Sequence, residues 1–99
     1  MYLLSGVRLE MDFEWFEEKR LWTLEQRGLD FRDVCQLFDG RPLYSYPSPR
    51  DDENRFVSVG VLGNRLIAVV WMERDGATRI ISMRRARHGE ERTYHALLG

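Results

Sequence analysis

The sequence predicts a single α+β domain in which two N-terminal helices pack on an antiparallel β-sheet, with a short C-terminal helix after the sheet. At 99 residues the chain can bury one core, but two separate cores would each be too small. Residues 15–27 are good helix formers without proline or glycine. The segments 55–60, 66–72 and 78–84 are rich in β-branched and aromatic side chains, as strands are.

The first predicted helix covers about residues 14–27, and Gly28 after it is the residue type that commonly ends a helix. Asp30 can cap a second helix over about residues 31–38. Four side chains in that second segment follow the i, i+3, i+4, i+7 spacing of one helix face: Phe31, Val34, Cys35 and Phe38. We therefore expect Cys35 to pack in the core.

The remaining elements are predicted from turn residues and prolines. Three prolines limit residues 40–54 to a short edge strand at about Leu43–Tyr46. Gly63-Asn64 and Asp75-Gly76 separate the three later segments as tight turns, which predicts an antiparallel meander. We expect residues 90–98 to form the C-terminal helix. Residues 1–10 carry no cap and no clear periodicity, so we expect them to be an extension before a domain of residues 11–99.

The composition excludes several classes of protein. Cys35 is the only cysteine, and with His88 and His95 it cannot complete a tetrahedral zinc site. No apolar run approaches the roughly 20 residues of a membrane span. The N-terminus lacks the basic and apolar regions of a secretory signal. We expect a cytoplasmic protein that needs no cofactor and no metal and does not bind membranes.

The charges are unevenly distributed along the chain, although the net charge is only −1. Residues 1–54 carry 7 basic and 12 acidic side chains, whereas residues 55–99 carry 8 basic and 4 acidic ones. This asymmetry indicates one surface for an anionic partner and another for a cationic partner. All basic residues except Lys19 are arginines, whose planar fork suits phosphate.

Two clusters of residues are candidates for a site. Lys19 lies between Trp15 and Trp22 on one helix face, where its stem can cover aromatic surface or its ammonium can be held for a phosphate. The run Arg79–Arg87 contains four arginines and can be a solvated face or part of a groove. On an unbroken strand Arg79 and Arg85 face one side, while Ser82 and Arg84 face the other.

Several segments, taken in order and spacing, resemble the BrnT family of toxins from about Asp12 to Tyr94. They are Phe13–Trp15 with Glu18 and Lys19, Gly28–Phe31, Leu37–Asp39, Arg55–Gly60, and Arg79–Ala86 followed by Glu91 and Tyr94. The chain departs from the family's usual first helix, which has an acidic residue after the tryptophan and ends in Asn-x-x-Lys-His-Gly. The corresponding residues here are Phe16, Thr23, Gln26 and Arg27.

The resemblance implies a RelE-like fold and a type II toxin that inhibits translation by cleaving RNA as a metal-independent endoribonuclease. It also implies neutralisation by a BrnA-like ribbon-helix-helix antitoxin, which would connect the toxin to operator DNA. In such an enzyme the RNA 2′-hydroxyl attacks the adjacent phosphate.

For that reaction we assign candidate roles to nine residues. Lys19, Arg79 and Arg84 would stabilise phosphate charge, and Glu91 or Tyr94 would transfer a proton. The candidate RNA-binding residues are Trp15, Arg55, Ser82 and Arg85. The alternative function is a non-catalytic partner that binds the antitoxin and helps to repress the operon. Cleavage of RNA separates the two functions, because a binding module leaves RNA intact.

Overall fold

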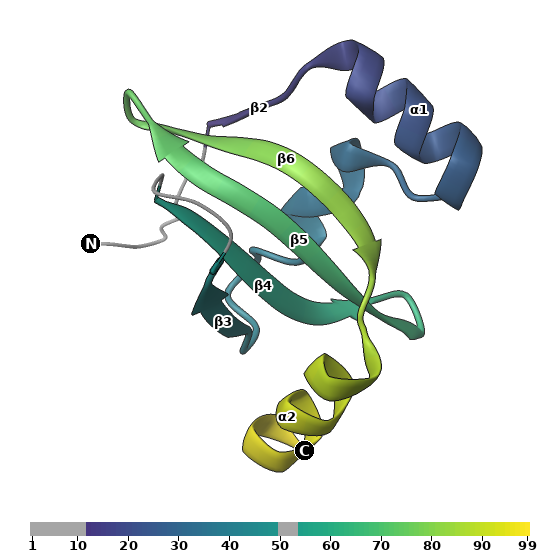
Figure 1. Ribbon diagram of the computed structural model, residues 1–99, viewed down its shortest axis with the longest axis vertical. Coiled ribbons are helices and arrows are strands. Elements are labelled where there is room, and N and C mark those ends of the chain that lie inside the picture. Colours follow the sequence, from purple (N-terminus) through teal and green to yellow (C-terminus); the bar gives the residue numbers. More distant parts are fainter. Residues whose placement is uncertain (1–11, 50–53) are drawn as a thin grey trace.

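The computed structural model of the protein describes residues 12–49 and 54–99 as one five-stranded sheet flanked by helices (Figure 1). The strand order is β2-β6-β5-β4-β3. The strands are β2 (Phe13–Glu14), β3 (Tyr44–Pro47), β4 (Arg55–Leu62), β5 (Arg65–Arg74) and β6 (Ala77–Arg85). The helices are α1 (Glu17–Arg27), the 3₁₀ helix η1 (Phe31–Gln36) and α2 (His88–Leu98). The α+β class is confirmed, and the predicted extension at residues 1–10 lies outside the described residues.

The sheet is mixed, whereas the sequence predicted an antiparallel one. Strands β3 to β6 form the expected antiparallel meander, but β2 pairs with β6 in parallel, with Phe13 opposite Thr78 and Glu14 opposite Arg79. The Thr78 amide also donates to the Asp12 carbonyl at 2.8 Å. Because residues 13–14 are held in this ladder, α1 begins at Glu17 rather than near residue 14.

The turns of the meander have the backbone that their residues predict. Asp75 and Gly76 both have positive φ, at 53° and 82°, as a two-residue turn between twisted antiparallel strands requires. Gly63 has φ 65° at the first position of the other turn. At the end of α1, Gly28 takes the left-handed conformation, and its amide donates to the Leu24 carbonyl at 2.9 Å.

The second predicted helix is a 3₁₀ helix, so within residues 12–49 only one α-helix precedes the meander. Asp30 caps it as expected, accepting a hydrogen bond from the Arg32 amide at 3.0 Å. Phe31, Val34 and Leu37 are buried at intervals of three residues, which match the three residues per turn of a 3₁₀ helix. This period turns Cys35 outward, and the prediction that Cys35 packs in the core is therefore wrong.

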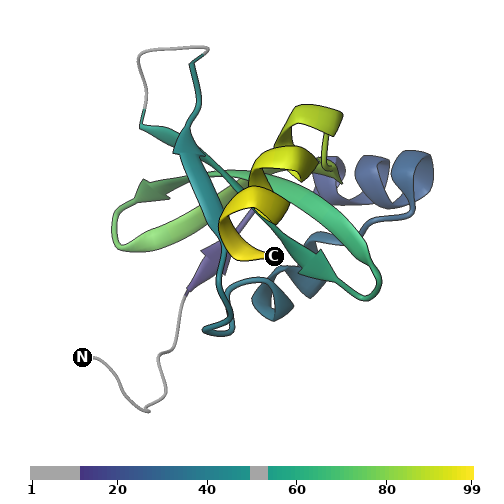
Figure 2. The same cartoon turned by 90° about the horizontal axis from the view of Figure 1, so that it is seen from below.

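Side chains pack on both faces of the sheet. Phe31, Val34 and Leu37 of the η1 segment cover one cluster that includes Ile67 and Met83. A second cluster, on the other face, contains Val57, Val59 and Ala68, with Tyr46 and Tyr94 against it. Figure 2 shows η1 and α2 on opposite sides of the sheet, with α1 beside it. No helix within the described ranges is long and apolar enough to cross a membrane.

Candidate functional site: a basic groove

A bulge in β6 determines which arginines share a face of the sheet. Val70 pairs with Ser82, but the next residue, Trp71, pairs with Ile80, so Ile81 is the extra residue. The bulge resets the alternation of side chains along the strand. Arg79 and Arg84, which we expected on opposite faces, therefore line the same one. Ser82 lines that face with Arg84, as predicted.

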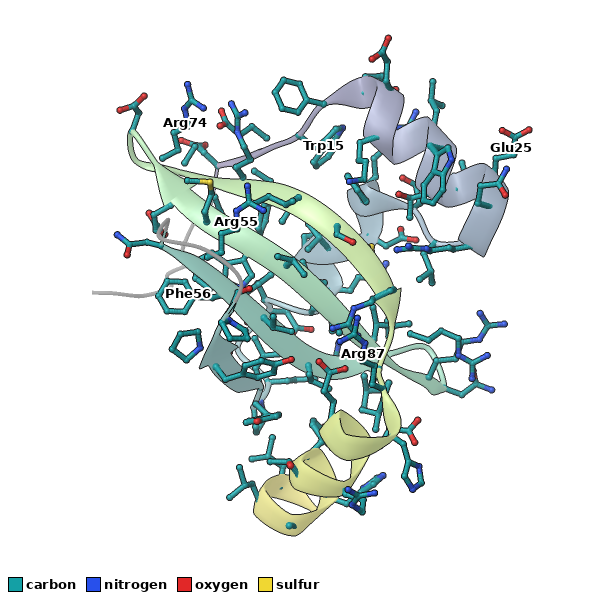
Figure 3. The ribbon with its side chains drawn as sticks, viewed as in Figure 1. Trp15, Glu25, Arg55, Phe56, Arg74 and Arg87 are labelled. Atoms are coloured by element: carbon teal, nitrogen blue, oxygen red, sulfur yellow. The ribbon has the colours of Figure 1, made fainter. Side chains whose placement is uncertain are left out.

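Two adjoining cavities, of about 640 and 560 Å³, form one groove between α1 and the sheet. Both cavities are lined by Lys19, Arg55 and Ile81. The basic groove, as we call it, has seven basic side chains: Lys19, Arg27, Arg55, Arg74, Arg79, Arg84 and Arg87. No acidic residue is among the described residues that line it. In Figure 3, Arg74, Arg55 and Arg87 spread over this face, from the β5–β6 turn to the start of α2.

Arg84 is held by a buried carboxylate that the sequence analysis did not single out. Its two terminal nitrogens donate to the Glu90 carboxylate at 2.8 and 2.9 Å. The same carboxylate accepts from the Arg87 amide at 2.7 Å, which caps the first turn of α2, and from the Tyr46 hydroxyl. Because the fork of Arg84 is fixed in this way, its charge is preorganised beside the groove.

The ionisation states in this cluster follow from burial and these hydrogen bonds. Burial acts to raise the pKa of Glu90, but the hydrogen bonds from Arg84, the Arg87 amide and Tyr46 outweigh it and lower the pKa to about 2. Burial, followed by the hydrogen bond to Glu90, raises the pKa of the Tyr46 phenol. At neutral pH Glu90 is therefore a carboxylate and Tyr46 is protonated.

Arg79 is positioned from the other end of the groove. Its Nε donates to Glu14 at 2.8 Å, and its guanidinium lies 4.8 Å from the ring centroid of Phe16. Glu14 is opposite Arg79 in the β2–β6 ladder, so backbone pairing brings the two side chains together. The side chain of Arg79 is only 20% exposed. This cation is thus oriented by its own neighbours before any ligand binds.

The α1 wall of the groove is anchored at both ends of the helix. The buried Arg20 donates to Glu17 at 2.6 and 2.9 Å and to Asp30, the cap of η1, at 3.1 Å. At the other end, Arg27 donates to the Met83 carbonyl of β6 at 2.9 Å. Lys19 immediately precedes Arg20, and its side chain is exposed and makes no hydrogen bond or ion pair with any residue that the structure describes.

The structure brings together five of the nine predicted site residues in the basic groove. They are Lys19, Arg55, Arg79, Ser82 and Arg84. The other four do not line it. Trp15 packs against Phe31, with ring centroids 6.2 Å apart, and Tyr94 lines a separate cavity of about 270 Å³ with Leu37 and Leu43. Arg85 is exposed opposite Ile67, and Glu91 lies in the first turn of α2.

The residues that sequence reasoning missed are Arg27, Tyr46, Arg74, Arg87 and Glu90. A local signal for Glu90 was present, because it is the third residue after Arg87, and an acidic residue there commonly caps a helix. The expected helix began at residue 90, which hid that relationship. For Tyr46 no sequence signal exists, since its role depends on the packing of β3 against α2.

Chemically, the basic groove is suited to a chain of phosphates. Seven cations line it, and the carboxylates of Glu14 and Glu90, which orient Arg79 and Arg84, do not, so the lining presents positive charge to which a polyanion can bind. No group of three or more potential metal ligands occurs among the described histidine, cysteine, aspartate and glutamate residues.

A family model described as the ribonuclease toxin BrnT of a type II toxin–antitoxin system matches residues 15–90. The chain belongs to the BrnT family. All residues that line the basic groove, and Glu90 with them, fall within the matched segment. As a BrnT toxin the protein is a ribonuclease, with RNA as its substrate and an antitoxin as its partner. No curated protein matches the chain significantly.

Proposed function

We propose that this BrnT toxin is a metal-independent endoribonuclease that inhibits translation by cleaving RNA in the basic groove. The observation that carries the proposal is a lining of seven cations with no carboxylate among the described residues. Such a lining binds phosphates directly but offers none of the acidic oxygen ligands that Mg²⁺ prefers. RNA supplies its own nucleophile in the 2′-hydroxyl.

In the proposed reaction the 2′-oxygen forms a bond to the adjacent phosphorus, and the bond from phosphorus to the 5′-oxygen breaks. The 2′-hydroxyl proton passes to water in the open groove, and the products are a 2′,3′-cyclic phosphate and a 5′-hydroxyl. Lys19, Arg79 and Arg84 stabilise the negative charge that grows on the phosphate oxygens. Two of these cations are already oriented, Arg79 by Glu14 and Arg84 by Glu90, which favours such stabilisation.

The leaving 5′-oxygen needs a proton, which the Lys19 ammonium on the groove lining can give. Tyr46 also lines the groove, but its hydroxyl already donates to Glu90. The sequence indicated Glu91 and Tyr94 for proton transfer. Neither residue lines the groove, and these two roles remain predictions. Arg55 and Ser82 lie on the lining and are proposed to bind the RNA backbone.

For the partner, we propose a BrnA-like ribbon-helix-helix antitoxin that links the toxin to operator DNA. Glu18 and Glu25 are exposed on α1, where they can attract a lysine- or arginine-rich segment of the antitoxin. In Figure 3 Glu25 points away from the sheet. We also propose that the helices and sheet correspond to a RelE-like arrangement.

The function is tested by incubating the purified toxin with single-stranded RNA in the presence of EDTA. We expect cleavage products that end in a 2′,3′-cyclic phosphate. Arg79→Gln should lower the cleavage rate about 10²–10³-fold, as loss of one preorganised donor does elsewhere, because Glu14 orients this cation in advance. The matched control is Arg65→Gln, which removes an exposed cation outside the groove.

Two results would reject the proposal. Activity that appears only when a divalent cation is added would overturn the metal-independent reaction. Intact RNA at every toxin concentration would favour the non-catalytic, antitoxin-binding function instead.

A further inference from the structure

Trp22 is a large aromatic side chain that remains in solvent beside the basic groove. It is 47% exposed, whereas Trp15 and Trp71 pack against the core. Trp22 lies one helical turn after Lys19, and the guanidinium of Arg27 sits 5.1 Å from its ring centroid. Lys19 and Arg27 both line the groove. The indole therefore stands at the rim of the groove, next to two of its cations.

The position of the indole is set by a residue that is itself fixed. Arg27 donates to the Met83 carbonyl at 2.9 Å and so is tied to β6 while its guanidinium lies over Trp22. The ring adds little to the core because about half of it remains in water. An exposed indole that is oriented in advance loses little conformational freedom when a flat ligand stacks on it.

We propose that Trp22 is a stacking site for an unpaired nucleobase of the RNA whose phosphates occupy the basic groove. The inference rests on the proposed function, because it requires RNA in that groove. The phosphates would contact Lys19 and its neighbouring cations. The adjacent base would unstack from its neighbours in the strand and lie on the exposed part of the indole. A base in a duplex is already stacked and paired, so Trp22 gives the toxin a preference for single-stranded RNA.

Binding can be measured without cleavage if the RNA carries 2′-O-methyl groups, which remove the nucleophile. The probes are a single-stranded 2′-O-methyl oligonucleotide of about 12 nucleotides and its duplex. Stacking of one base on an aromatic side chain is typically lost on alanine substitution with about a 10-fold weakening or more. We expect Trp22→Ala to weaken single-strand binding to this extent and to change duplex binding less than about twofold.

Two further variants separate stacking from a general effect on α1. Trp22→Phe keeps an aromatic face and should retain most of the single-strand affinity. Leu21→Ala removes a neighbouring side chain that is similarly exposed, at 50%, and should bind both RNAs as the unaltered protein does. In addition, single-stranded RNA should quench tryptophan fluorescence in the unaltered protein, and this quenching should be lost in Trp22→Phe although binding persists.

The outcomes distinguish failure of the stacking site from failure of the proposed ribonuclease function. The stacking site is wrong if Trp22→Ala binds single-stranded RNA with unchanged affinity. It is also wrong if the substitution weakens binding of the single strand and of the duplex equally. Loss of affinity in Lys19→Met would in that case leave the groove as the RNA site. If the unaltered protein binds neither probe, both the stacking site and the proposed function are overturned.

Discussion

Glu90 accepts hydrogen bonds from both terminal nitrogens of Arg84, at 2.8 and 2.9 Å, and thereby joins the first turn of α2 to the floor of the basic groove. Both side chains are largely buried, with 8% of Glu90 and 17% of Arg84 exposed. Since Glu90 also accepts from the Arg87 amide, one carboxylate orients a groove cation and begins a helix. Folding and the geometry of the site are thus coupled at this residue.

Glu90→Gln should destabilise the protein, because it leaves the partly buried charge of Arg84 uncompensated. We expect a loss of about 2 kcal/mol, slightly below the usual cost for a fully buried pair. For a domain of this size that corresponds to a fall in Tm of about 10 °C. Glu91→Gln is the control, since the Glu91 side chain has no hydrogen bond to the described residues, and its Tm should hardly change. Equal Tm values for the two variants would contradict the role of Glu90.

The same carboxylate predicts a specific response to acid. The pKa of Glu90 is lowered from 4.5 to about 2 in the folded protein, with burial opposing the hydrogen bonds that lower it. Its charge therefore stabilises the fold above about pH 4.5, and this contribution is lost as the pH falls towards 2. Urea unfolding at pH 6, 4 and 3 should show the stability gap between the unaltered protein and Glu90→Gln narrowing with acid. A gap that stays constant would argue against this linkage.

The 3₁₀ helix η1 predicts the reactivity of the single thiol. Cys35 is exposed, so a thiol reagent such as Ellman's reagent should modify the native protein rapidly, at one group per chain. Moving the thiol one position inward, in the double variant Cys35→Ser with Val34→Cys, places it at a site that is 1% exposed and should slow the reaction strongly. If the unaltered protein and the double variant both react slowly when folded, and fast only when denatured, the 3₁₀ conformation of η1 is wrong.

The basic groove predicts how RNA binding depends on salt. Each cation that neutralises a phosphate of a single strand contributes about 0.7 to the slope of log affinity against log salt concentration. With the 2′-O-methyl single strand, Lys19→Met should reduce this slope by about 0.7. Arg65→Gln, outside the groove, should leave the slope unchanged. A slope that is insensitive to Lys19 would remove this residue from the phosphate-binding surface.

Much of the fold was predictable because local backbone chemistry determines it. The Asp75-Gly76 turn, the Asp30 cap and the Gly28 helix end all depend on residues close together in the chain, and all three are confirmed. The start of α1 was not predictable from local signals. It depends on pairing between residues 13–14 and residues 78–79, which no nearby pattern encodes.

The site was predictable as a set of residue types but not as an arrangement. Lys19, Arg79 and Arg84 were identified from their scarcity and clustering, and they do lie in one groove, whereas Arg85 of the same cluster does not line it. Their shared face depends on the bulge at Ile81, where neither glycine nor proline marks the irregularity. The expected burial of Cys35 failed for a related reason, because the spacing of its segment fits α and 3₁₀ periods almost equally well.

The short parallel pairing of β2 with β6 also has a consequence for the order in which the protein matures. During synthesis the α1 segment, with Lys19 and Arg27, emerges from the ribosome before Arg79 and Arg84 have been added to the chain. Until β6 emerges, β2 has no strand to pair with, and the groove has a wall but no floor. Contacts between such distant segments form late and slowly in folding. The basic groove of this toxin can therefore assemble only after the last strand of the sheet has been synthesised.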